Sequence, residues 1–192
     1  MSSFPGKQKK YTYEDYLKWD DNNRYELIEG VPYLLASPSV LHQTVVGNIY
    51  FRFKGCLNDR KCKVFTAPLD VLLPQNEHIE EKDIDVVVQP DIFIVCDESK
   101  IKGGKNCKGA PDMIIEVLSP ATASRDFITK QNLYERAGVK EYWVVSPEEK
   151  NIVVFRMDER MKYNTYGIYG EDSVVEVRIF PDLTIPVKDI FV

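Results

Sequence analysis

The sequence predicts one α+β (mixed α/β) domain with a central mixed β-sheet flanked by helices. Two segments with helical spacing are separated by many strand-like segments, and hairpins outnumber βαβ units. The length of 192 residues suits one domain better than two. We therefore assign residues 1–10, which are mostly polar, to a flexible N-terminal segment, and residues 11–192 to a single domain.

The composition is that of a globular protein with an acidic balance. Apolar residues make up 44% and charged residues 29%, which excludes disorder of the whole chain. The 25 lysines and arginines face 30 acids, a net charge of −5, so any contact with nucleic acid must come from a local basic patch. Because no apolar run reaches membrane-spanning or signal-peptide length, we expect no membrane association and a cytoplasmic location.

The four cysteines, Cys56, Cys62, Cys96 and Cys107, show no metal-binding or redox spacing. No Cys-x-x-Cys pair occurs, and the chain has only two histidines, so a thiolate or imidazole metal site is not indicated. In a reducing cytosol these cysteines are expected to be buried small hydrophobic residues.

Local signals predict the elements in the first third of the chain. Thr12 followed by Asp15 resembles a capping box, which predicts a short helix to about Trp19. Residues 24–28 and 31–35 flank a Glu-Gly pair and predict a tight hairpin. Apolar residues then recur at helical spacing from residue 39 to residue 57, which predicts a long helix with one buried face.

The remaining two thirds read mainly as strands. A second long helix is predicted over residues 123–137, ended by the left-handed residue Gly138. The predicted strands cover residues 63–66, 70–73, 91–95, 113–118, 141–145, 152–157, 162–166 and 174–179. Between two of them lies a basic, glycine-bearing loop, residues 100–109, which is either a solvated lid or an approach to a phosphate backbone.

Two acids in strand-like segments are the most informative residues. Asp91 opens one strand, and Glu116 lies near the end of another, inside an apolar run where a carboxylate is costly unless it is paired, protonated or bound to a metal. Side by side, the two acids could hold Mg²⁺ or Mn²⁺ through hard oxygen ligands, with the backbone carbonyl of Val117 added. The alternative is that Glu116 ends a strand and pairs with a surface lysine.

The order of these acids resembles the PD-(D/E)XK nuclease superfamily: Pro90-Asp91, then Glu116-Val117, then a helix. More closely, residues 11 to about 186 resemble the Uma-type restriction endonuclease family. The resembling stretches are residues 24–30, Pro38-Ser39 with His42, residues 89–91, 110–112 and 116–120, Asp126, Lys130, Tyr134 and residues 138–143. This resemblance implies a restriction-endonuclease-like fold and metal-dependent hydrolysis of DNA.

The sequence departs from the superfamily pattern at one position. The superfamily lysine would stand two residues after the acid, where this chain has Leu118. The resemblance implies that the lysine has migrated to the following helix, as Lys130. The competing interpretation is an exposed helix pair, because Asp126 and Lys130 are separated by four residues.

The resemblance adds two further candidates, each with an ordinary structural alternative. Glu26 occupies the position of an early acid that completes the metal site, although an ion pair with Arg24 on the same strand face would also explain it. His42 stands where the family has a histidine that could bond a carboxylate or contact the scissile phosphate. It could equally pack or cap the long helix. Tyr134 and Trp143 are expected to pack a helix onto the sheet.

The resemblance therefore implies a Mg²⁺-dependent endodeoxyribonuclease. Its implied catalytic residues are Asp91, Glu116, Lys130, Glu26 and His42, and its implied metal ligands are Asp91, Glu116, Val117 and Glu26, so we expect these acids and Lys130 to converge in one cleft. The implied partner is DNA, and a homodimer could join two modest basic patches around one duplex. Two alternatives remain: a non-catalytic nucleic-acid-binding or assembly module with the same fold, and a calcium-stabilised structural domain.

Overall fold

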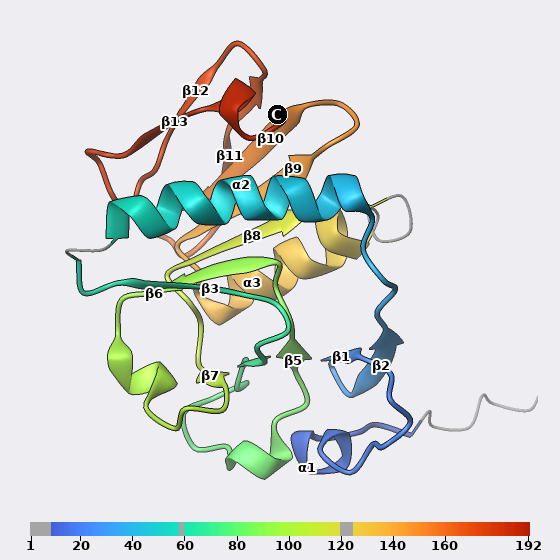
Figure 1. Ribbon diagram of the computed structural model, residues 1–192. Helices are drawn as coiled ribbons and strands as arrows, with labels where there is room; N and C mark the ends of the chain where they lie inside the picture. The colour runs from blue at the N-terminus through green and yellow to red at the C-terminus, as the bar shows by residue number, and fades with distance from the viewer. Residues whose placement is uncertain (1–8, 58–59, 120–124) are drawn as a thin grey trace, which may run out of the picture.

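The computed structural model describes residues 9–57, 60–119 and 125–192. Most of the predicted flexible segment, residues 1–10, lies outside the described residues. Figure 1 shows the long helix α2 (Val40–Leu57) lying across a sheet whose other face is covered by the helix α3 (Gln131–Ala137). The predicted α+β class with a central mixed sheet is confirmed.

The central sheet has six strands in the order β11-β10-β9-β8-β6-β3. Within it, β8 and β9 are parallel, and the other neighbours are antiparallel. The bounds are β3 (Lys63–Thr66), β6 (Ile92–Val95), β8 (Met113–Val117), β9 (Glu141–Ser146), β10 (Asn151–Met157) and β11 (Tyr163–Gly170).

Alternate residues of the central strands enter two different cores. Ile115 and Trp143 pack with α2 on one face, and Ile114 and Tyr142 pack with α3 on the other. Trp143 and Tyr134 are fully buried, which confirms their predicted packing role. Burial on both faces explains why β8 and β9 are almost continuously apolar in sequence.

A second, five-stranded sheet has the order β2-β1-β5-β4-β7, and only the β4–β7 pair is parallel. A third core cluster of the protein lies between this sheet and the first helix, α1 (Tyr13–Tyr16). The bounds are β1 (Tyr25–Ile28), β2 (Val31–Leu34), β4 (Val71–Leu72), β5 (Val87–Val88) and β7 (Cys107–Lys108). A separate hairpin joins β12 (Val174–Glu176) and β13 (Thr184–Pro186) near the C-terminus.

Short helical turns complete the described chain. Three of them are 3₁₀ helices: η1 (Glu81–Asp83), η2 (Glu98–Ile101) and η4 (Val187–Asp189). The basic loop, residues 100–109, is anchored near both ends. The Lys100 ammonium donates to the Ala110 carbonyl at 2.7 Å, and Lys108 belongs to β7. Within the described residues, no helix combines the length and apolarity that crossing a bilayer requires.

Two predicted helix boundaries are corrected. The Thr12–Asp15 capping box is present, but α1 ends at Tyr16 rather than near Trp19. The second predicted helix, residues 123–137, begins outside the described residues and then consists of a π-helix, η3 (Arg125–Lys130), followed by α3. Gly138, with φ of 90°, ends it as predicted.

The expected state of the cysteines is wrong for three of the four. Cys62 and Cys96 form a disulfide, and Cys56 is exposed. The antiparallel pairing of β3 with β6 sets Lys63 opposite Val95, so the two cysteines are the next residues to face each other across the sheet. Linear spacing does not reveal this pairing. Cys107 is buried, and desolvation raises the pKa of its thiol to about 11.

Candidate active site

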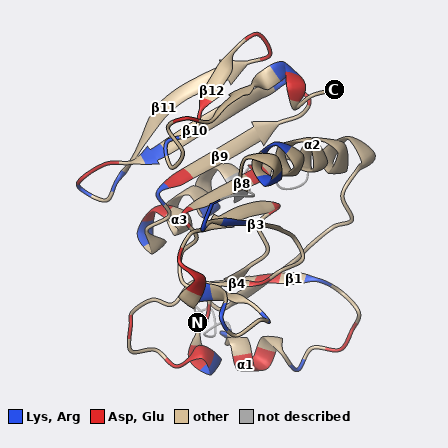
Figure 2. Cartoon of the chain, turned by 60° about the vertical axis from the view of Figure 1, so that its left-hand side comes forward, with Lys and Arg blue, Asp and Glu red and all other residues tan. Residues whose placement is uncertain are grey.

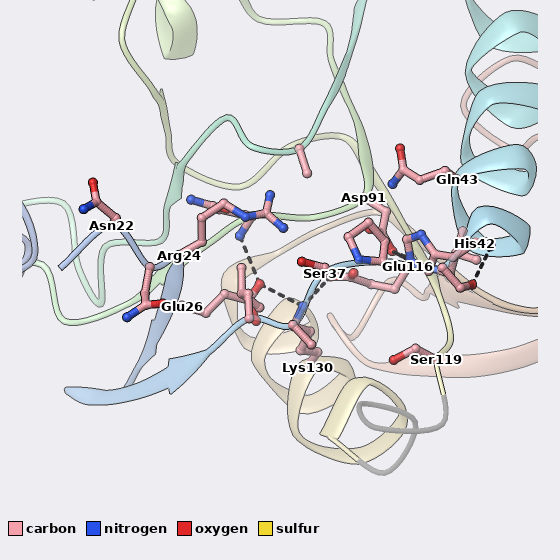
Figure 3. Close-up of a pocket in the computed structure, with 18 residues that line it drawn as sticks. Asn22, Arg24, Glu26, Ser37, His42, Gln43, Asp91, Glu116, Ser119 and Lys130 are labelled. Carbon is pink, nitrogen blue, oxygen red and sulfur yellow. Dashed lines mark hydrogen bonds and ion pairs between the residues drawn. The ribbon is translucent and has the colours of Figure 1, made fainter.

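A pocket of about 760 Å³ opens where the hairpin β1–β2, the start of α2 and the ends of β6 and β8 approach one another (Figure 3). It contains every candidate of the sequence analysis, although they come from distant parts of the chain. Its described lining residues are Asn22, Asn23, Arg24, Glu26, Leu35, Ala36, Ser37, Pro38, Ser39, His42, Gln43, Ala67, Gln89, Asp91, Glu116, Val117, Ser119 and Lys130.

Lys130 lies at the base of this pocket between two carboxylates. Its Nζ is 2.8 Å from Glu26 Oε1 and 2.9 Å from Glu116 Oε1, and Figure 3 shows the ammonium between the two acids. Lys130 is only 3% exposed. The alternative of an exposed Asp126–Lys130 pair is therefore wrong for Lys130, which is buried. The side chain of Asp126 is not among those that the structure describes.

Tyr134 holds the same oxygen of Glu116 that Lys130 contacts. Its hydroxyl donates to Glu116 Oε1 at 2.6 Å. Full burial, followed by the nearby charge of Glu116, raises the pKa of Tyr134 well above its ordinary value, so the hydroxyl keeps its proton. The sequence predicts only a packing role for Tyr134. Its position four residues after Lys130, on the same helical face, is the signal that was available.

Asp91 connects three elements at the other side of the pocket. Its Oδ2 accepts a hydrogen bond from the Val117 backbone N–H at 2.8 Å and lies 3.2 Å from His42 Nε2. His42 is in the first turn of α2, where its own N–H donates to the Ser39 hydroxyl at 3.1 Å. His42 therefore borders the pocket and contacts an acid, in addition to lying at the start of the helix.

Glu26 is fully buried on β1 and is fixed through one oxygen. Oε1 accepts the Gln89 N–H at 3.0 Å as well as the Lys130 ammonium. Oε2 is buried and makes no hydrogen bond with the described residues. The ammonium of Lys130 accounts for the charge of Glu26, so a local pair with Arg24 is not needed to explain its burial.

A polar network behind Glu26 was not predicted. The side-chain amide of Gln89 donates to Asp70 Oδ1 at 3.0 Å and to the Tyr16 hydroxyl at 3.2 Å, and that hydroxyl donates to the same Asp70 oxygen at 3.1 Å. The network fixes the backbone of Gln89, whose N–H bonds Glu26. Residues separated this widely give no pattern in sequence.

Asp70 gives this network a testable pH dependence. Burial raises the pKa of its carboxyl, against the opposing hydrogen bonds from Gln89 and Tyr16. The folded-state pKa of Asp70 exceeds the unfolded value of about 3.9. The stabilisation that Asp70 contributes is therefore fully present at pH values below about 3.9. It is lost as the pH rises through the folded-state pKa.

We therefore expect Asp70→Asn to remove this dependence. The free energy of unfolding of the wild type minus that of the variant should fall as the pH is raised from about 4 to about 7. The reason is that only the wild type has a titrating carboxyl at position 70. Urea unfolding of both proteins across this range measures the difference. A difference that rises with pH would contradict the assignment.

The donor set matches a hard divalent cation in kind. Asp91, Glu116 and the Val117 carbonyl offer oxygen ligands on neighbouring strands, which is the preference of Mg²⁺. Within the described residues, however, no three His, Cys, Asp or Glu side chains are grouped closely enough to hold a metal as they stand. Between Glu26 and Glu116 the resident cation is the Lys130 ammonium. Of the predicted ligands, Glu26 and Glu116 are thus each already paired with this ammonium through one carboxylate oxygen.

Comparison with known proteins identifies the family. A family model described as putative restriction endonuclease, Uma2, matches residues 13–188. The chain belongs to the Uma2 family. A curated relative, an uncharacterized protein of Synechocystis sp., is 23% identical over 153 residues, which cover 78% of this chain and 76% of the relative.

A solved structure has the same fold as this Uma2 chain. It is the crystal structure of a putative nuclease belonging to DUF820 from Anabaena variabilis, with a TM-score of 0.73 and 21% identity. The match covers 94% of this chain and 97% of that chain. The predicted restriction-endonuclease-like fold, and the predicted family, are thereby confirmed.

Proposed function

We propose that this Uma2 protein hydrolyses phosphodiester bonds in DNA with the help of Mg²⁺ or Mn²⁺. The observation that supports this most strongly is the buried Lys130 between Glu26 and Glu116, in the same pocket as the Asp91–His42 pair. Desolvating an ammonium and two carboxylates is expensive, and hydrophobic residues of similar size would often be at least as stable. Retaining such a cluster at the base of a pocket is typical of a functional site.

Each residue has a role in this proposal. Asp91, Glu116 and the Val117 carbonyl would hold the divalent ion, which supplies a lowered pKa for a nearby water and offsets charge on the phosphate. Lys130 orients the attacking water and stabilises negative charge that develops on the phosphate oxygens. Glu26 positions Lys130 through their contact.

Two further residues position the acids. The Tyr134 hydroxyl and the Lys130 ammonium both donate to Glu116 Oε1, and these two donors hold the carboxylate of Glu116 in place. His42 fixes the orientation of Asp91 through its contact with Oδ2. Preorganised groups of this kind contribute to the rate because they need no rearrangement in the transition state.

DNA cleavage tests the proposal. Purified protein should cleave DNA, offered both as a supercoiled plasmid and as a single strand, only with Mg²⁺ or Mn²⁺, and Glu116→Gln should reduce the rate by at least about 10²-fold. Glu29→Gln is the matched control, because Glu29 lies in the same hairpin as Glu26 but is exposed and pairs with Arg136 at 2.6 Å. The control should cleave at the wild-type rate.

The two alternatives predict different results in DNA-binding and thermal-unfolding experiments. Metal-independent retention of DNA without cleavage would favour the non-catalytic binding or assembly module. Stabilisation by Ca²⁺ that does not change in Lys130 variants would favour the calcium-stabilised structural domain. The homodimer and the cytoplasmic location stay predictions.

A further inference from the structure

We infer that the site acts on DNA whose bases are unpaired, such as a single strand or a single-stranded flap, rather than on an intact duplex. The inference rests on the proposed hydrolysis of DNA and specifies its substrate. Three properties of the pocket carry it: the depth of the reacting groups, the small number of cations in its walls, and the amide side chains among its lining residues.

Four of the five proposed site residues lie below the protein surface, and the side chain of the fifth, Asp91, is 19% exposed. Glu26 is fully buried, Glu116 and Lys130 are each 3% exposed, and His42 is 8% exposed. A scissile phosphate must therefore enter the pocket, together with part of its nucleotide. An intact duplex is a stiff rod with a persistence length of about 50 nm and cannot easily bend one nucleotide inward. Unpaired nucleotides have no partner strand to leave, so entering the pocket costs them less.

The walls contain few positive charges. Two lining cations among the described residues, Arg24 and Lys130, face the carboxylates of Glu26, Asp91 and Glu116. Lys130 is already paired with two of these acids. Figure 2 shows Lys and Arg scattered among Asp and Glu rather than joined in a continuous stripe in that view. Duplex-binding proteins usually neutralise several phosphates, so this pocket suits a short contact with one strand.

Amide groups in the walls match the edges of unpaired bases. The lining residues Asn22, Asn23 and Gln43 each offer donors and an acceptor, which can bond the pairing edges that a duplex conceals. Gln89 also lines the pocket, and its Oε1 is buried and accepts no hydrogen bond from the described residues. The walls thus favour bases over additional phosphates.

Cleavage of matched DNA substrates tests the inference. One labelled sequence is offered as a single strand, as a blunt duplex and as a duplex with a single-stranded flap, with Mg²⁺ or Mn²⁺. We expect kcat/KM for the single strand to exceed that for the blunt duplex by at least about tenfold, with cuts in the flap rather than in the paired arm. Equal or faster cleavage of the blunt duplex would overturn the inference and leave the proposed hydrolysis intact. Cleavage of none of the three would overturn the proposed function itself.

Discussion

Replacing Lys130 with methionine is expected to lower the free energy of unfolding by about 3–5 kcal/mol and to abolish cleavage. The cost follows because removing one member of a buried ion pair leaves the others uncompensated, and here Glu26 and Glu116 both lose their ammonium. Methionine keeps an unbranched side chain of similar length, so the loss of packing is small. Urea unfolding and single-turnover cleavage of the same preparation measure the two effects.

A compensating substitution separates charge from packing. Glu26→Gln in the Lys130→Met background removes one of the two stranded carboxylates, while its remaining oxygen can still accept the Gln89 N–H. We expect the double variant to recover at least about 1 kcal/mol of stability, in the range of measured couplings between contacting residues, without recovering cleavage. Recovery of cleavage would remove Lys130 from the chemistry.

Lys18 supplies the control for an ordinary surface lysine. It pairs with Glu14 at 3.2 Å, four residues away, and both side chains are more than half exposed. Lys18→Met should cost less than about 0.5 kcal/mol and leave cleavage unchanged. If Lys130→Met cost no more than Lys18→Met, the buried arrangement of Lys130 would be contradicted.

Local signals in the sequence were enough to predict most of the helices and strands. The Glu29-Gly30 hairpin forms as predicted, and both residues have positive φ angles of 51° and 79°. The helix from residue 39 onward forms because its apolar spacing is long and regular. The second helix is the informative failure, since a π-helical segment has no separate hydrophobic period by which it could be distinguished.

The residues themselves pointed to Asp91 and Glu116, but the complete site was accessible only through the ordered resemblance to a family, since most of its contacts join residues that are distant in sequence. Composition and spacing could not show that Lys130 pairs with Glu26, because only the folded sheets bring β1 beside the helix after β8. The same holds for the Cys62–Cys96 disulfide, which depends on strand register. Gln89 and Asp70 were missed because neither has a local partner that would mark it as unusual.

Divalent metal is expected to stabilise the wild-type protein, and Asp91→Asn is expected to reduce that gain. A ligand that binds only the folded state adds about 2.7 kcal/mol at a concentration of 100 times Kd. Asparagine keeps an oxygen that can accept the Val117 N–H, which Asp91 Oδ2 accepts at 2.8 Å, but it lacks the charge that attracts a cation. Thermal unfolding with Mg²⁺, with Mn²⁺ and with a chelator measures the gain for each protein.

The metal response is the decisive measurement for Asp91, because the metal-free stability of the variant reflects two opposing effects. Removing one carboxylate relieves repulsion among the acids, which alone would leave Asp91→Asn as stable as the wild type or more stable. The contact between Asp91 Oδ2 and His42 Nε2, 3.2 Å long, opposes this gain, since the substitution weakens it. Asp70→Asn, which alters a carboxylate outside the pocket lining, should keep the full metal response. An equal metal-induced rise in Tm for Asp91→Asn and the wild type would exclude Asp91 as a ligand, and Glu116 with Glu26 would then be the pair to test.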